Sequence, residues 1–374
     1  DIYDHLLSEK NVKIPTPTAI PRKQARNEYD GIEAMKEAEL DFLRATVLSE
    51  STEPCILYND MPIGNMMTDQ DFRQKYLNGF SVILKKGLHI DFIHYMNRPL
   101  PELMTGLENY LPMYMTGQVS PYYLPAEQSG TFMHLLKVSG AAALEGSAVA
   151  GNHEFGRYVL HQSRADLDHY RKQAEDLFDH AKPLLESFSS EREAEFSALL
   201  SKQWESGNRK TVCTSLPVCL AEEGLLEEIM QGAGLTQDLK DEILRYHSES
   251  RSSLMRLLEK NRAHYDLPKL DEEAFTKAPL SLALSDIFVE ESVPLTFDMY
   301  QRYLDGVEEL AAEHDNLLIG YDTSPVLRNI NYTLIRGRLV IISKEKSPAI
   351  HFAIYHKRLV RAFVNFIPKR AKQP

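Results

Sequence analysis

The stretch that decides the fold is PCILYNDMPIGNMMTDQDFRQKYLNGFSVILKKGLHIDFI, residues 54–93. Its first five residues form a short apolar run that predicts a strand. Residues 69–86 have the pattern of a helix that ends at Gly87, and residues 88–93 form a second apolar run. This order of strand, helix and strand predicts an α/β fold with mixed sheets flanked by helices.

The segments on either side extend the same alternation. Residues 29–48 predict one helix and residues 101–110 predict another. Residues 131–161 hold three short strand candidates separated by glycines, and residues 164–186 carry a helical apolar stripe. These elements together define a first α/β half at residues 29–189.

The last third of the chain repeats this element order. A helix at 296–313 is followed by four predicted strands and a closing helix, at 316–321, 328–335, 339–343, 349–355 and 356–367. The repetition indicates an internal duplication. We therefore divide the chain into the end of a truncated helical domain at 1–10, a Pro-rich linker at 11–28, a first α/β half at 29–189, a helical insert at 190–290 and a second α/β half at 291–374.

Composition restricts the partners and the compartment. The net charge of -12 makes the chain repel phosphate backbones, so it is a poor binder of nucleic acid by itself. The three cysteines are an odd and low count, which fits a reducing, cytoplasmic environment. No apolar run reaches the length of a membrane span, so no membrane partner is expected.

Three segments carry a resemblance to a known family. They are Asp1–Leu7, then residues 14–35 from Ile-Pro-Thr-Pro to Tyr-Asp-Gly-Ile-Glu-Ala-Met, and residues 111–140 with Leu-Pro-Met-Tyr-Met-Thr-Gly-Gln and Leu-Lys-Val-Ser-Gly. They resemble the C-terminal region of Firmicute-type helix-turn-helix transcriptional regulators of the XRE (Cro/repressor-like) class, and residues 1–10 then resemble the end of the truncated helix-turn-helix domain.

The resemblance implies a function and a set of partners. It implies a sensing and dimerisation region, with operator DNA bound through an N-terminal domain that is largely missing from this sequence. A homodimer is expected because operators of this class are commonly two-fold. The effector is an unknown small molecule or peptide, and no DNA-contacting or ligand residue can be carried over.

A second pattern points toward phosphodiester chemistry. His134-Leu135-Leu136-Lys137 is followed by Gly146-Ser147, which is similar to the His-x-Lys and Gly-Ser pattern of phospholipase D-like enzymes. The two residues are three apart, however, which places them on opposite faces of a strand. We therefore expect no enzyme and no catalytic residue, with two degenerate phospholipase D-like pseudo-repeats as one interpretation of the fold. A phosphodiesterase of that class and a scaffold that binds no ligand remain the alternatives.

The candidate ligand-binding residues include a group of tyrosines. Tyr114, Tyr122 and Tyr123 surround two prolines, and each offers a flat face and a polar tip that suit a small-molecule pocket. A dimer interface would use them equally well, and simple core packing is favoured over both. With His134 and Lys137 they form the predicted ligand-binding set.

Other reactive side chains have no matching pattern. The histidines lack metal-ligand spacing and no phosphate-binding glycine loop occurs, so neither a metal nor a cofactor is expected. Cys213 and Cys219 are interpreted as buried thiols, with a redox pair as the alternative.

Overall fold

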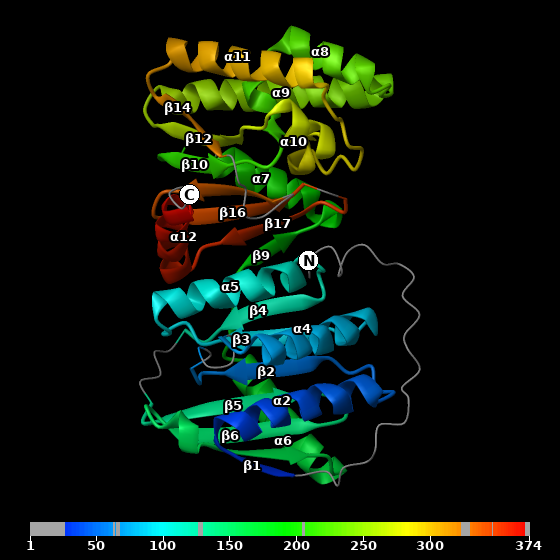
Figure 1. Cartoon of the computed structure of the whole chain (residues 1–374), viewed down its shortest axis with the longest axis vertical. Helices are drawn as coiled ribbons and strands as arrows, with labels where there is room; N and C mark the ends of the chain where they lie inside the picture. Colours follow the sequence, from blue (N-terminus) through cyan, green and yellow to red (C-terminus); the bar gives the residue numbers. More distant parts are fainter. Residues whose placement is uncertain are drawn as a thin grey trace. The chain divides into compact units, whose positions relative to one another are not determined.

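The computed structural model describes residues 27–62, 64, 68–125, 130–203, 206–322, 330–345 and 347–370. The chain divides into two compact units, Asp1–Leu184 and Leu185–Pro374, here called the first and the second unit. Each unit is built on one large mixed sheet flanked by helices (Figure 1), which confirms the predicted fold class. The predicted helical end at 1–10 and nearly all of the Pro-rich linker at 11–28 lie outside the described residues.

The first unit has an eight-stranded sheet in the order β1-β7-β6-β5-β2-β3-β4-β8. Its central strands β2, β3 and β4 are parallel, and the neighbours on either side are antiparallel. The strands are β1 Glu28–Asp30, β2 Cys55–Asn59, β3 Ile90–His94, β4 Val119–Tyr123, β5 Phe132–Val138, β6 Ala143–Val149, β7 Arg157–His161 and β8 Lys182–Pro183.

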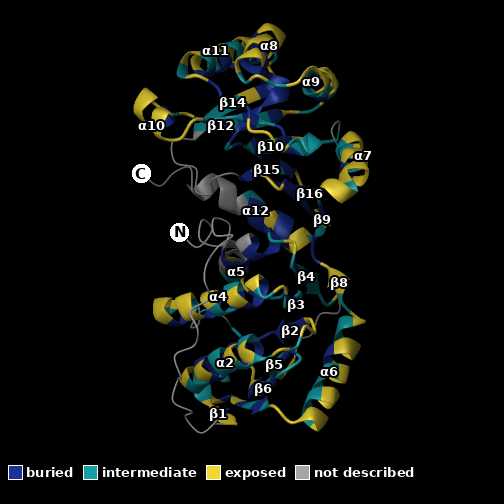
Figure 2. Cartoon of the chain, turned by 90° about the vertical axis from the view of Figure 1, so that its right-hand side faces the viewer, coloured by how far each residue is buried: buried dark blue, intermediate teal, exposed yellow. Residues whose placement is uncertain are grey.

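Helices cover both faces of this sheet. They are α2 Gly31–Leu48, α4 Gln70–Lys85, α5 Leu100–Tyr114 and α6 Arg164–Phe178. Figure 2 shows α6 on one side of the strands and α2 and α4 on the other. The helix α6 buries Ala174 against Ile93 and Val138. It ends at Phe178 instead of the predicted residue 186, because Lys182–Pro183 pairs with β4.

The second unit has a seven-stranded sheet in the order β14-β12-β10-β15-β16-β17-β9, and β11 and β13 form a separate pair. The strands are β9 Glu186–Phe188, β10 Arg209–Val212, β11 Leu216–Pro217, β12 Ala263–Pro268, β13 Leu282–Ala283, β14 Leu317–Asp322, β15 Ile330–Ile335, β16 Leu339–Lys344 and β17 Ile350–Ile354. The α-helices are α7 Glu193–Gln203, α8 Glu223–Gly232, α9 Gln237–Leu258, α10 Glu272–Lys277, α11 Phe297–Glu313 and α12 Lys357–Arg370. Short 3₁₀ turns occur in both units at η1 His153–Phe155, η2 Ser190–Arg192, η3 Val218–Leu220 and η4 Ser285–Ile287.

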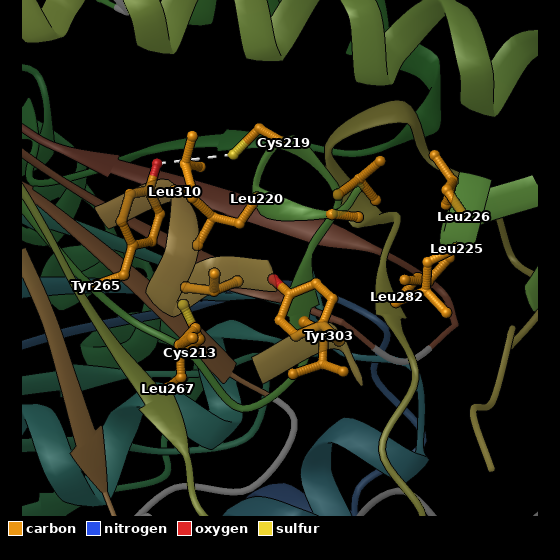
Figure 3. Close-up of a cluster of buried hydrophobic side chains, with 14 of the residues drawn as sticks. Cys213, Cys219, Leu220, Leu225, Leu226, Tyr265, Leu267, Leu282, Tyr303 and Leu310 are labelled. Carbon is orange, nitrogen blue, oxygen red and sulfur yellow. Dashed lines mark hydrogen bonds between the residues drawn. The ribbon is translucent and has the colours of Figure 1, made fainter. Parts of the chain in front are cut away.

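The main core of the second unit lies between the parallel strands and the helices α8, α9 and α11. Tyr265 and Leu267 extend from β12 into this core, and Tyr303 enters it from α11 (Figure 3). The hydroxyl of Tyr303 donates to the carbonyl of Pro217 at 2.9 Å, so its polar end is satisfied inside the core. None of the helices in the described part of the chain is both long and apolar enough to cross a membrane.

The two units repeat one topology. Strands β10, β12 and β14 are parallel like β2, β3 and β4, and an antiparallel series follows beside β10 as it does beside β2. The second copy of this arrangement takes in residues from 185 onward and not only the last third of the chain.

The predicted helical insert at 190–290 is wrong. That segment contains β10 and β12, which pair directly with β15 and β14 in the sheet of the second unit. Hydrophobic periodicity does not predict the strand β10, because its sequence, Arg209-Lys210-Thr211-Val212, is short and mostly polar. Residues 190–290 are thus part of the second α/β fold, which begins near residue 185.

Candidate ligand pocket

A cavity lies on one face of the sheet in the second unit. Its cavity volume is about 70 Å³, several times the space that one water molecule requires. Side chains two residues apart on a strand share a face, so β10, β15 and β16 each direct alternate residues toward this cavity. These are Arg209, Thr211, Asn331, Thr333, Ser343 and Glu345. The cover comes from α7, η3, η4 and α9 through Gln203, Cys219, Asp286 and Tyr246.

One end of the cavity is acidic. The Oε1 atom of Glu345 accepts hydrogen bonds from Ser285 Oγ and from Asn331 Nδ2, both at 2.7 Å. Its Oε2 atom is shielded from solvent and has no hydrogen-bond partner among the described residues. Asp286 also lines the cavity and accepts a hydrogen bond from Tyr246 at 2.8 Å. Burial, and then the negative charge of Asp286, raises the pKa of Glu345 to about 8.

A hydrogen-bond network holds this end in place. The ring of His351 is fully buried and stacks on Phe196 with ring centres 3.9 Å apart. Its Nε2 donates to the carbonyl oxygen of Ser285 at 2.9 Å, and its Nδ1 accepts from Ser343 Oγ at 2.8 Å. Burial lowers the pKa of His351, which keeps the ring neutral and suits this pair of hydrogen bonds. These two hydrogen bonds to His351 therefore fix the positions of Ser285 and Ser343.

Asn331 is fixed in the same way. Its Oδ1 accepts from the backbone N–H of Thr214 at 2.6 Å, and its Nδ2 also donates to Ser215 Oγ at 3.0 Å. The amide orientation is thereby set, and Nδ2 must face the carboxyl group of Glu345.

The opposite end of the cavity is basic. Arg209 opens β10 and pairs in register with Ile335, four residues along β15 from Asn331. That separation corresponds to about 13 Å along the strand. The guanidinium is buried, and burial lowers the pKa of Arg209 from its ordinary value. The cavity therefore has opposite charges at its two ends.

The cysteines of the cavity are buried, free thiols, as predicted. Burial raises the pKa of Cys213 well above its ordinary value and that of Cys219 to about 11. The sulfur of Cys219 lies 3.8 Å from the hydroxyl of Tyr265. Both groups are thiols and not thiolates near neutral pH, so neither is an activated nucleophile.

The predicted tyrosines do not line one pocket. Tyr114 ends α5, where its hydroxyl shares a hydrogen bond with His94 Nε2 at 2.6 Å. Tyr123 pairs in register with His94 and therefore shares that face of the first unit's sheet. Tyr122 lies on the opposite face, where its ring packs against that of Phe178 on α6 with ring centres 4.6 Å apart. The alternation of side chains along β4 separates them, and core packing accounts for Tyr114 and Tyr122.

His134 and Lys137 do not form a site either. They lie on opposite faces of β5, as their spacing predicts. Lys137 is buried, forms an ion pair with Glu39 and donates to the hydroxyl of Tyr76 at 2.8 Å. His134 is exposed on the other side. Lys137 therefore belongs to the core of the first unit, away from any surface that a ligand could reach.

The sequence contains a signal for the observed pocket. Asn331 and Thr333 occupy every second position of β15, and Ser343 and Glu345 do the same along β16. Period-two polar residues usually mark the solvent face of a strand, so the pattern predicts exposure. Here that face is covered in part by α7, η4 and α9, and the polar side chains line a cavity. In the described part of the chain, no cluster of three or more His, Cys, Asp or Glu side chains could hold a metal ion.

Comparisons with known proteins identify no family. No family profile matches the chain, and no curated protein matches its sequence. One similar structure is TrmBL2, an archaeal chromatin protein with a novel mode of DNA binding, at 9% identity and a TM-score of 0.29 over 45% of this chain and 56% of that one. Another is polyphosphate kinase from Porphyromonas gingivalis, at 8% identity and a TM-score of 0.27 over 91% of this chain and 49% of that one. The chain thus matches about half the length of each protein, and at these TM-scores neither likeness bears on its fold or function.

Proposed function

We propose that this chain is the sensing and dimerisation region of a bacterial, cytoplasmic helix-turn-helix transcriptional regulator, and that its second unit binds a small effector. The resemblance of residues 29–35 and 111–123 to XRE-class regulators supports the class. The observation that carries the sensing role is the cavity around Glu345, where one shielded oxygen of the carboxyl group has no hydrogen-bond partner among the described residues. Such a group is costly to bury and gains stability when a ligand donates to it.

Binding, and not catalysis, is the role that the chemistry of the cavity supports. The thiols of Cys213 and Cys219 stay protonated, and His351 is buried behind the serines instead of facing the space. The effector would favour one arrangement of the dimer and so change the spacing of two DNA-binding domains. The acidic chain itself would stay off the operator because its net charge is -12.

A ligand screen on the purified chain tests the sensing role. Metabolites and short peptides would be screened by thermal shift, and each positive compound confirmed by calorimetry. A true effector raises the melting temperature in proportion to its occupancy of the folded state. The variant Thr333→Phe fills the cavity and abolishes the shift, whereas Thr276→Phe, on the exposed side of α10, preserves it. A screen in which no compound binds would favour the scaffold.

Light scattering during size-exclusion chromatography tests the dimerisation role. The proposal expects the mass of two chains, because two-fold operators require a two-fold protein. A monomer at all accessible concentrations contradicts this part of the proposal and leaves the pocket unaffected.

A further inference from the structure

We infer that the effector carries a primary ammonium group, which binds between Glu345 and Asp286 at the acidic end of the pocket. This inference rests on the proposed function, since it names the class of ligand for the same site.

The hydrogen-bond inventory at this end calls for a donor. Ser285 and Asn331 both donate to Oε1 of Glu345, so that in the ionised carboxylate Oε2 is an acceptor with no donor among the described residues. A carboxylate accepts several hydrogen bonds, and an ammonium group provides three donors. An alcohol could provide one donor but no charge, and a carboxylate ligand would bring a third negative group to Glu345 and Asp286.

The charges around this end favour a cation. Glu345 directly follows β16 and Asp286 lies on η4, and the hydroxyl of Tyr246 donates to Asp286. The backbone of Arg209, the basic residue of the cavity, pairs with Ile335, which lies four residues or roughly 13 Å along β15 from Asn331. The titratable and charged groups that line the cavity together with Glu345 are Asp286 on η4, Tyr246 on α9, Cys213 after β10, Cys219 on η3 and Arg209 on β10. The ring of His351 on β17 lies behind Ser285 and Ser343.

The protonation state of Glu345 couples binding to proton release. In the empty pocket its pKa is about 8, so the carboxyl group is largely protonated at pH 7. An ammonium ion stabilises the ionised carboxylate, and the displaced proton passes to the buffer. At pH 7 a group with this pKa releases about 0.9 proton per cation bound, and the affinity rises about tenfold per pH unit up to pH 8.

The size of the cavity limits the ligand. A buried cavity of about 150 Å³ accommodates benzene, and the volume here is about 70 Å³. The cavity therefore has room for a compact aliphatic amine. Such a ligand would place its ammonium group on Glu345 and leave its aliphatic part against Ile341 and Val218 of the lining.

Calorimetry with matched small probes tests the inference. The full chain would be titrated with ethylamine and 1,3-diaminopropane, and with 1-propanol and propionate as neutral and anionic matches. Each titration would be run in phosphate and in HEPES, whose different ionisation enthalpies reveal the protons released. We expect the amines alone to bind, with close to one proton released at pH 7. Binding of an amine without proton release overturns the inference.

Two variants locate the site. Glu345→Gln keeps the shape and the hydrogen bonds of the side chain but cannot ionise, so it should weaken amine binding at least tenfold and abolish proton release. Asp286→Asn should weaken binding and reduce proton release without abolishing it, because the charge of Asp286 is one of the two causes that raise the pKa of Glu345. The matched control Glu313→Gln removes a charge from the exposed end of α11 and should change neither quantity. Amine binding that Glu345→Gln leaves intact overturns the inference.

The same data separate two kinds of failure. If the metabolite screen finds a ligand without an amine that Thr333→Phe excludes, the sensing role stands and the ammonium assignment is wrong. If neither the screen nor the probes show binding, both proposals fail together.

Discussion

Glu345 links the stability of the second unit to pH. Its pKa of about 8 in the folded chain lies above the ordinary value of 4.5 that it has when unfolded, so the folded state holds more protons between these values. Its contribution is therefore fully present below pH 4.5 and is lost as the pH rises toward 8, by on the order of 4 kcal/mol. Glu345→Gln should remove this dependence. Urea unfolding on both sides of pH 8 measures it, and equal pH slopes for wild type and variant would contradict the assignment.

Lys137 and Glu39 form a buried ion pair, and its contribution to the stability of the first unit depends on both partners. Burial lowers the pKa of Lys137 and raises that of Glu39, so each group is costly without the other. Lys137→Met should destabilise the first unit by about 3 kcal/mol, because Glu39 is left without its cation. The double variant with Glu39→Leu should recover most of that loss. Urea unfolding of the four proteins completes the cycle, and strictly additive losses would show that the pair is not coupled.

The residue types of a pocket are easier to predict than their grouping. Tyr122 and Tyr123 are adjacent in the sequence and are tyrosines that could serve a pocket, yet β4 turns one to each face of the sheet. Pro121 obscures this strand, because proline rarely occurs inside one. The proximity of Lys137 to His134 in the sequence suggests a shared site. Its actual partner, Glu39, lies 98 residues away, and no local sequence pattern predicts a contact over that separation.

At the scale of elements, the apolar runs correctly predict the strands β2 and β3, whereas the mostly polar strand β10 is not predicted. The strands β2 and β3 are short hydrophobic runs, and both lie where the pattern places them. In β10, Arg209 and Thr211 line the cavity, and Lys210 pairs with Asp266 at 2.6 Å. The polar residues of β10 that line the pocket stand where apolar residues would have identified the segment as a strand.

Gly146 shows how tightly one element packs. The sequence suggested that it separates two strands, but it lies inside β6, opposite Tyr158 on β7. A Cβ atom at Gly146 would overlap the ring of Tyr158, which is fully buried. Gly146→Ala should therefore cost about 1–3 kcal/mol through overpacking.

The matched control is Gly306→Ala in α11, where a Cβ atom would meet nothing within 4 Å. That change should stabilise the helix by about 0.5–1 kcal/mol, since alanine is the better helix former. Chemical denaturation compares the two variants, and a neutral effect of Gly146→Ala would show that Tyr158 has room to move.

At the scale of the whole molecule, the duplication explains why the two polar clusters look alike. In the first unit, Lys137 on β5 meets Glu39 on α2 and Tyr76 on α4. In the second unit, the corresponding elements are β15, α7 and α9, and these line the cavity. The same place in the repeated topology is filled by an ion pair in one unit and is hollow in the other. We therefore expect the proposed effector to bind at this place in the second unit.

Separate sheets and cores should give the chain two unfolding transitions. The strand β8 completes the sheet of the first unit and β9 that of the second, and only two residues, Leu184 and Leu185, lie between them. Each unit thus has its own hydrophobic core and should unfold as its own cooperative step. In scanning calorimetry, Lys137→Met should lower one transition and Glu345→Gln should change the pH dependence of the other. An amine ligand should raise only the transition that Glu345→Gln affects. One transition that responds to all three perturbations would mean that the units unfold together, and effector binding would then be felt throughout the chain.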